Sequence, residues 1–252
     1  MTDTREQAGE AAVQRWASLT ESHSIREVAL IADASNTEID RLNARAQHLR
    51  AERGELGQHE VALPHQHYGL REGDLIAFTK QHRTPGEKRV ENGARGQVTH
   101  VDEQALTVTL DGSERRVDLA GEDLGSLRLG YTQHVYRQQG ATVDRSVVVT
   151  GGWQTSEESA YVQASRAREG TEWFLAREEL GVEGLDERRV GKLAGKMRTS
   201  RAHTPSLAHP ELADPEYGTG YRRPIAPSRS RLPGVLRTVN RIVNPPTKER
   251  TR

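Results

Sequence analysis

Two segments of this sequence carry residue types that suit phosphate chemistry. The first, residues 130–144, reads GYTQHVYRQQGATVD and is followed directly by the apolar run SVVVT. A strand end, a polar and aromatic loop and a glycine turn would place Tyr136, Arg137 and Gln139 at the edge of a sheet. Arginines and main-chain amides bind phosphate oxygens, and tyrosines stack on bases. The alternative is an ordinary loop in which Gly140 serves only a turn, because glycine turns are common.

The second segment, residues 161–169, reads YVQASRARE and precedes another apolar run, EWFLA. Its composition predicts a helix that ends near Arg166 and Arg168, where positive charge complements the helix dipole. An arginine is always protonated and can act as a finger on a transferring phosphoryl group, an effect of about 10³ to 10⁵ in rate. The plainer interpretation is a solvated basic helix end, and the segment taken alone favours it.

Together, in this order and about twenty residues apart, the two segments resemble motifs V and VI of superfamily 1 DNA helicases. The resemblance is closest to the RecD-like branch and to the conjugative relaxase-helicases. In the first motif Tyr131, Gln139 and Gly140 match, whereas His134 and Tyr136 stand where the family has threonine and histidine. The exact contacts with a nucleic-acid strand therefore depart from the family pattern.

The second family motif reads Thr-Arg-Ala-Arg, and residues 165–168 match it with serine in place of threonine. The resemblance implies that Arg166 is the arginine finger that touches the γ-phosphate. It also implies nucleotide-binding or coupling roles for Gln139, Gly140 and Arg168. The residues it assigns to DNA contacts are Asn36, Tyr131, His134, Tyr136 and Arg137.

Two further stretches agree with this family. Residues 28–47 resemble the opening of its second motor lobe, and residues 73–102 resemble the start of an SH3-like insertion in that lobe. The resemblance covers about residues 29–176. It implies a RecA-like fold of the P-loop NTPase type, single-stranded DNA as a partner, and ATP with Mg²⁺ as cofactors.

A complete motor of this kind needs a glycine-rich phosphate loop and an acidic pair at the end of a buried strand. Residues 191–197 imitate the end of the loop twice, as GKL and GKM, but no hydroxyl residue follows either lysine. Asp33 ends an apolar strand, but Ala34 stands where the second acid belongs. We therefore expect ATP and Mg²⁺ to bind only when a first RecA-like lobe is present, in trans or upstream in an intact gene. The chain alone is expected to be inactive as an enzyme.

The elements that must position these residues are predicted from hydrophobic periodicity. Residues 3–19 have an apolar stripe near the helical period, and VALIA, residues 28–32, has the continuous apolar character of a strand buried on both faces. Asn36 or Thr37 can cap a helix that runs to about residue 51. This strand-turn-helix unit is typical of a doubly wound parallel sheet, so the predicted fold class is α/β.

The period changes between residues 70 and 124, where short alternating runs indicate strands at 74–78, 96–101, 105–110 and 115–119. Tight turns between them predict a small SH3-like β-barrel inserted in the α/β domain. The α/β pattern then resumes, with strands at 128–132, 146–150 and 172–176, and helices at 134–138, 156–166 and 178–197, the last interrupted near 181–184. The expected domains are residues 1–69 (helix and first strand-helix unit), 70–124 (insertion), 125–198 (rest of the lobe, with both motifs) and 199–252 (disordered tail).

Composition narrows the function classes. The chain has no cysteine, so disulfides, thiol catalysis and cysteine zinc sites are excluded, and the ten histidines lack metal-ligand spacing. From Arg198 onward there are eleven basic and four acidic residues, so a proline-rich tail of about plus seven balances a body of about minus seven. That tail is either a phosphate-attracting segment or a solvated linker. No apolar run reaches the roughly 20 residues of a membrane span, so a cytoplasmic location and no membrane partner are expected.

The leading hypothesis from the sequence is a second motor lobe of an ATP-dependent DNA helicase or translocase that acts in plasmid transfer or DNA processing. A second hypothesis is a non-enzymatic module that binds or docks single-stranded DNA on the same fold. A third is a non-functional fragment of a split helicase gene.

Overall fold

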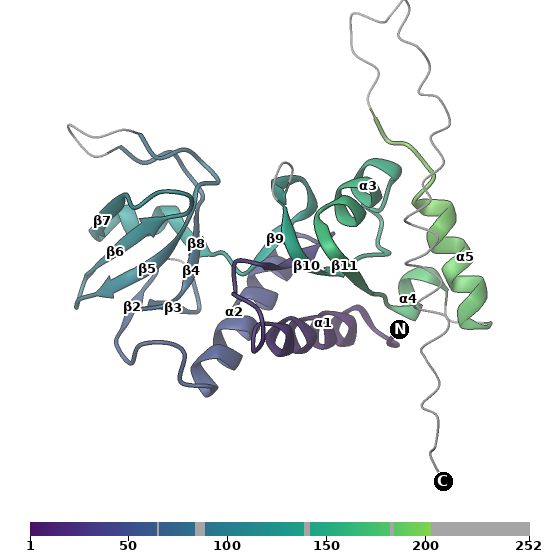
Figure 1. The fold of residues 1–252 in the computed structure, drawn as a ribbon, viewed down its shortest axis with the longest axis horizontal. Coiled ribbons are helices and arrows are strands. Elements are labelled where there is room, and N and C mark those ends of the chain that lie inside the picture. Colours follow the sequence, from purple (N-terminus) through teal and green to yellow (C-terminus); the bar gives the residue numbers. More distant parts are fainter. Residues whose placement is uncertain (65, 84–88, 139–141, 182–183, 203–252) are drawn as a thin grey trace, which may run out of the picture.

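The computed structural model describes residues 1–64, 66–83, 89–138, 142–181 and 184–202, without the side chains of residues 137 and 138 (Figure 1). The predicted disordered tail lies outside the described residues from position 203 onward. The described part has a four-stranded parallel sheet, a five-stranded antiparallel sheet and a short two-stranded antiparallel pair. The α/β fold class with a parallel sheet is confirmed.

The parallel sheet has four strands in the order β11-β10-β1-β9. Their bounds are Val28–Ala32 for β1, Thr132–His134 for β9, Val143–Val149 for β10 and Ala167–Phe174 for β11. All three neighbouring pairs run parallel. β1 is buried at all five of its residues, as its continuous apolar sequence predicts for a strand with layers on both faces.

Alternation along β1 and β10 divides the core between the two faces of this sheet. Leu30, Val147 and Val149 pack on one face with helices α1 (Arg5–Leu19) and α2 (Asn36–Glu52). Ile31 and Val148 pack on the other face, where α3 (Glu157–Ser165), α4 (Arg177–Leu180) and α5 (Asp186–Lys196) lie with the 3₁₀ turn η2 (Val135–Gln138). The α/β unit formed by this sheet and helices α1 to α5, called the lobe below, therefore has three layers, with the sheet in the middle.

The N-terminus of α2 differs by one residue from the prediction. Ser35, and not Asn36 or Thr37, is the N-cap, and its hydroxyl accepts a hydrogen bond from the Glu38 amide at 3.2 Å. Serine satisfies an amide of the first turn that otherwise has no partner in the helix. The Asn36 side chain is consequently available for contacts outside the helix.

The insertion is a five-stranded antiparallel sheet in the order β7-β6-β5-β4-β8. Its strands are β4 (Leu75–Phe78), β5 (Arg95–Val101), β6 (Ala105–Leu110), β7 (Arg116–Ala120) and β8 (Leu127–Leu129), with the 3₁₀ turn η1 (Gly121–Ser126) before β8. A short antiparallel pair that the sequence did not reveal, β2 (Glu60–Ala62) and β3 (Gly69–Arg71), precedes them. Burial alternates along β7, so one face of the sheet forms a core. An SH3-like barrel stays a prediction.

The single strand predicted at residues 128–132 is wrong. β8 ends at Leu129 and pairs with β4 of the insertion, whereas β9 begins at Thr132 and pairs with β1 of the parallel sheet. Gly130 makes the crossing, and a Cβ there would lie 2.7 Å from the main-chain carbonyl carbon of Ile76. The close approach of the two backbones requires glycine at this position.

Asn43 of α2 fixes the same crossing from the other side. Its Nδ2 donates to the Leu129 carbonyl at 2.9 Å, and its Oδ1 accepts from the Thr132 amide at 2.6 Å. The asparagine is fully buried, so each of these bonds satisfies a main-chain group that water cannot reach.

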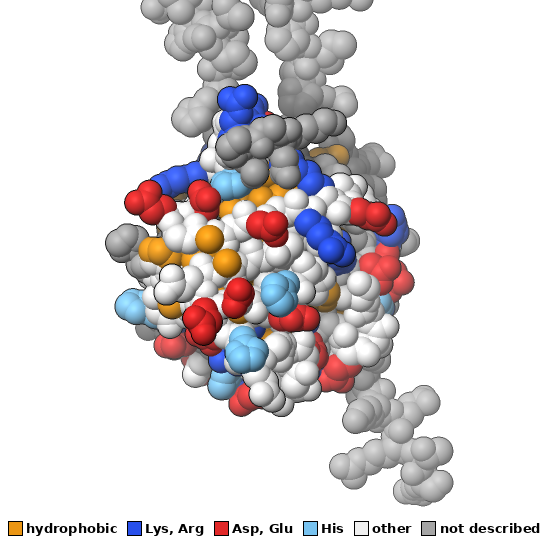
Figure 2. Space-filling view, turned by 90° about the vertical axis from the view of Figure 1, so that its left-hand side faces the viewer, with side chains coloured by type: hydrophobic (Ala, Val, Ile, Leu, Met, Phe, Trp, Pro, Cys, Tyr) orange, Lys and Arg blue, Asp and Glu red, His pale blue; other side chains and the backbone are white. Residues whose placement is uncertain are grey.

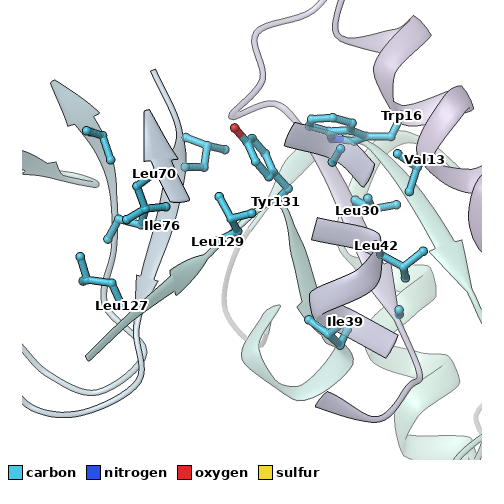
Figure 3. Close-up of a cluster of buried hydrophobic side chains, with 14 of the residues drawn as sticks. Val13, Trp16, Leu30, Ile39, Leu42, Leu70, Ile76, Leu127, Leu129 and Tyr131 are labelled. Carbon is cyan, nitrogen blue, oxygen red and sulfur yellow. The ribbon is translucent and has the colours of Figure 1, made fainter. Parts of the chain in front are cut away.

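One apolar cluster runs from the parallel lobe into the insertion. In Figure 3 Tyr131 stands between Trp16 of α1 on one side and Leu129 and Leu70 on the other. The cluster includes Val13 and Leu30 of the lobe as well as Ile76 of the insertion. The two units therefore share one core across their junction.

The outer end of the insertion has a mixed charge pattern. Figure 2 shows acidic, basic and histidine side chains interspersed on that face. Such a pattern does not favour a polyanion over other partners, because phosphate attraction requires an excess of positive charge.

Candidate functional site

The carboxyl ends of β1 and β9 bring two of the predicted site residues together. The register pairs Ala32 with His134, so the residues that follow β1 lie at the same edge as the end of β9. His134 Nε2 lies 2.9 Å from Asn36 Oδ1 and donates to it when Nε2 carries the proton. Asn36 and His134 are 98 positions apart in sequence, so the fold creates this pair.

Two further charged residues flank the pair. Arg128 Nη1 lies 3.5 Å from the same Asn36 oxygen, and Arg128 Nη2 donates to Asp40 at 2.6 Å. Asn36 is exposed and His134 is half-buried. Amide, imidazole and guanidinium groups therefore meet at one accessible edge, which is a set of groups that binds phosphate oxygens and base edges.

The arginines of the second motif lie at the opposite edge of the sheet. Arg166 is the C-cap of α3 and comes directly before β11. Its carbonyl accepts from the Val143 amide at 3.0 Å, at the amino end of β10. Arg168 Nη1 donates to Asp144 at 2.8 Å. The end of the first motif segment and the second motif are thus side by side.

The arginine proposed as the finger is half-buried and already positioned. Arg166 Nη2 donates to Ser165 Oγ at 2.9 Å, and its Nε reaches the same oxygen at 3.3 Å. Arg168 is more open, with a side chain that is 66% exposed.

The first motif segment connects the two edges. It leaves the carboxyl edge at His134 and returns to the amino edge at Val143. β10 has seven residues, so these edges are about 20 Å apart along the sheet. Tyr136 is 59% exposed on η2, the turn that directly follows β9. Gln139 and Gly140 lie outside the described residues, as does the side chain of Arg137, so their predicted roles stay predictions.

The predicted DNA contact of Tyr131 is wrong in this structure. The side chain is 3% exposed, its hydroxyl donates to Asp74, and it accepts from Arg50 Nη1 at 3.1 Å. Its ring meets Trp16 edge-on with centroids 5.6 Å apart. Burial and the Asp74 carboxylate raise the pKa of Tyr131 well above 10, so the phenol stays protonated and donates. Tyr131 joins the lobe to the insertion and does not face a ligand.

Asp33 and Lys196, which in the sequence imitate parts of a nucleotide-binding site, make structural contacts within the chain. Asp33 is buried and accepts from the Thr155 hydroxyl at 2.9 Å, and burial raises the pKa of its carboxyl. Lys196 Nζ donates to the Gly151 carbonyl at 2.6 Å. Each group serves a loop at the carboxyl edge of the sheet.

Metal and membrane sites find no support in the described part of the chain. Among its residues, no group of three acidic or histidine side chains is arranged to hold a metal ion. Of its helices, none is both long enough and apolar enough to cross a bilayer.

Two residues at the carboxyl edge were missed from the sequence. Arg128 lies in the strand that was predicted to belong wholly to the parallel sheet, and its approach to Asn36 depends on the crossing at Gly130. Trp153 is 76% exposed in the loop after β10. A tryptophan directly after two glycines at the end of a buried strand was the signal that could have identified it.

Comparison with known proteins gives structural similarities only. No protein-family model matches the sequence, and no curated protein matches it. A Pif1 helicase from Bacteroides in complex with ADP-AlF3 and single-stranded DNA is 16% identical, with a TM-score of 0.43, over 69% of this chain and 49% of that one. A Pif1 helicase from a structure of two coordinating Pif1 helicases at forked double-stranded DNA is 18% identical, with a TM-score of 0.42, over 80% of this chain and 55% of that one. The Pif1 helicase of Candida albicans is 17% identical, with a TM-score of 0.39, over 70% of this chain and 52% of that one. This chain spans about half the length of each of these proteins.

Proposed function

We propose that this chain is the second motor lobe of an ATP-dependent superfamily 1 DNA helicase or translocase, of the RecD-like kind found in conjugative relaxase-helicases. The observation that carries the proposal is the hydrogen bond from the Val143 amide to the Arg166 carbonyl, at 3.0 Å. It joins the end of the first motif segment to the second motif, although the two are separated in sequence. Adjacency of these segments is what a joint nucleotide-facing role requires.

Arg166 is the residue proposed to face the nucleotide. Its guanidinium is permanently charged and half-exposed, and it sits at a helix end where the sheet begins a new strand. When ATP and Mg²⁺ are bound by a first lobe, they supply the transferring phosphoryl group and its counter-charge. Arg166 would place positive charge on the oxygens of that group, and Arg168 would add a second cation once it leaves Asp144.

The carboxyl edge is proposed to hold the DNA strand. Asn36 and His134 form a hydrogen-bonded pair there, and Tyr136 offers an exposed ring on the turn that follows. An amide and an imidazole can bind phosphate or base edges, and an aromatic ring stacks on bases without regard to sequence. A single strand fits this set better than a duplex, because stacking needs bases that are not already paired.

The test is reconstitution of ATP hydrolysis. The chain is mixed with a first lobe from a matching helicase, and DNA-stimulated hydrolysis is measured with and without Arg166→Ala. The expected result is a kcat lower by about 10³ to 10⁵, which is the range for arginine fingers, with unchanged DNA affinity. Arg41→Ala is the matched control, since Arg41 is an exposed arginine paired with Glu6 on the opposite face.

Retention of the full hydrolysis rate by Arg166→Ala would show that the assigned role is wrong. Fluorescence anisotropy with a labelled oligonucleotide across a salt series separates the other hypotheses. Binding that weakens with salt, ignores ATP and never stimulates hydrolysis would favour a non-enzymatic DNA-binding module. Absence of any binding at low salt would favour a non-functional fragment.

A further inference from the structure

Trp153 has a surface position that neither motif explains. The chain has three tryptophans, and the other two, Trp16 and Trp173, are only 1% and 6% exposed. Trp153 is 76% exposed. An indole is one of the largest apolar groups, so leaving it in water forgoes the burial that the other two obtain. Tryptophan is enriched at binding surfaces, because its indole combines a large apolar ring with a polar N–H group.

The loop that carries Trp153 lies at the point where the chain topology changes direction. β1 and β10 are neighbours in the sheet. The chain leaves β1 toward α2 on one face and leaves β10 toward α3 on the opposite face. In open parallel sheets, ligands bind outside the carboxyl ends of strands at such a switch point. Asn36 follows β1 and Trp153 follows β10, so both belong to this position.

Hydrogen bonds fix the backbone of this loop. The Gly151 amide donates to Thr155 Oγ1 at 3.0 Å, and the Gly151 carbonyl accepts from Lys196 Nζ at 2.6 Å. The Trp153 carbonyl accepts from Arg201 Nη1. Thr155 also donates to Asp33 at 2.9 Å, which ties the loop to the end of β1. The indole is therefore exposed from an anchored loop.

Two acidic groups near this loop, Glu158 and Glu179, are engaged by local donors, whereas Glu157 is exposed. Glu158 accepts from the Ser200 hydroxyl and from the amides of Arg201 and Ala202. Burial raises the pKa of its carboxyl, but the bonds from Ser200 and the Arg201 amide outweigh this effect and contribute to a pKa of about 2. Glu179 pairs with Arg5 at 3.0 Å. Arg201 adds an exposed cation beside Trp153. The donors on Glu158 and Glu179 and the cation of Arg201 reduce the negative potential that an anionic ligand would meet at this loop.

We infer that Trp153 stacks on a base of the single strand whose neighbouring part contacts Asn36 and His134. The inference rests on the proposed function and adds a specific base-binding position to it. Of the four large hydrophobic side chains exposed in the described part, three are aromatic, namely Tyr136, Trp153 and Tyr161. Aromatic rings among polar neighbours suit base stacking, whereas the centre of a protein interface buries a contiguous apolar patch.

Tryptophan fluorescence provides a direct test. Because Trp16 and Trp173 are buried, iodide quenches mainly Trp153 in the free chain. Addition of a short oligothymidylate is expected to quench Trp153 emission and to remove its accessibility to iodide. Trp153→Ala should weaken binding by between about 5-fold and about 150-fold, the equivalent of one stacked base. Trp153→Phe should restore most of the affinity, and Leu185→Ala, which removes another exposed side chain, should leave it unchanged.

The outcomes separate this inference from the proposed function. Normal oligothymidylate binding without quenching, and with full affinity in Trp153→Ala, overturns the stacking role and leaves the second-lobe proposal in place. Protection from iodide by an added first lobe in the absence of DNA also overturns it, because a protein then covers the indole. No binding of oligothymidylate by the unaltered chain overturns both.

Discussion

Substitution of Tyr131 by phenylalanine tests the structural role that replaces its predicted DNA contact. The change removes only the hydroxyl, so the edge-on contact of the ring with Trp16 is kept. The hydroxyl donates to Asp74, which is fully buried, and accepts from Arg50. A hydrogen bond to a charged group contributes about 1.5–3 kcal/mol. The free energy of unfolding at neutral pH should therefore fall by about 2 kcal/mol.

The loss of stability in Tyr131→Phe should depend on pH, and the titration of Asp74 decides in which direction. Burial raises the pKa of this carboxyl above its ordinary value of 3.8, while Tyr131, the Arg71 amide and Gln47 act in the opposite direction. A carboxyl with a raised folded-state pKa stabilises the fold at low pH, and that contribution is lost as pH rises through the folded-state pKa. Without the tyrosine hydroxyl the pKa rises further. The deficit of the variant is therefore largest at neutral pH and shrinks as Asp74 becomes protonated.

Urea unfolding of the Tyr131→Phe variant at neutral and acidic pH measures both quantities. Tyr161→Phe is the matched control, since its side chain is 56% exposed, and it should unfold like the unaltered chain. Affinity for single-stranded DNA should be unchanged in Tyr131→Phe under conditions where it is folded. A variant of normal stability with weakened DNA binding would refute the reasoning, because it would return Tyr131 to the DNA-contacting surface.

Two further substitutions test the contacts that hold the site. Arg5→Met should lower the free energy of unfolding by about 3 kcal/mol, because it leaves the partly buried Glu38 and Glu179 without their shared cation. Urea unfolding measures this loss, and a value near zero would contradict the prediction. Asn43→Leu should lower the free energy of unfolding by about 2–4 kcal/mol, because two buried main-chain groups lose their hydrogen-bond partner. Amide hydrogen exchange at the start of β9 should become faster, and an unchanged exchange rate would count against the contact.

The sequence identifies elements whose burial is uniform or strictly periodic. β1 and β6 have the predicted bounds, because an unbroken apolar run and a clean alternation are local signals. β11 was predicted to begin at Glu172 but begins at Ala167. It is the edge strand of the sheet, and its first residues, AREGT, are exposed or half-exposed. An edge strand with little buried surface has no apolar signature to detect.

Long-range contacts explain the remaining differences. The division between β8 and β9 depends on Gly130 lying against Ile76, a contact that no local window contains. Tyr131 was assigned to a DNA contact through the resemblance of its segment to the family motif. Its actual partners, Asp74 and Arg50, are 57 and 81 positions away. Asn36 and His134 were each assigned to DNA contacts through resemblance to a family, but their pairing appears only in the structure, where the cap at Ser35 leaves the Asn36 side chain available.

If the proposed function holds, helix α3 connects the DNA-binding edge of the sheet to the edge that bears the proposed arginine finger. It begins beside the loop of Trp153 at the carboxyl edge and ends at Arg166 at the amino edge. Its nine residues make about two and a half turns, and a capping box of Ser156 and Ser159, both buried, fixes its first turn. η2, which follows His134, packs against the same helix. A strand bound at the carboxyl edge would therefore lie near the first turn of the helix whose last turn precedes Arg166, so α3 is the element that would connect the two proposed sites.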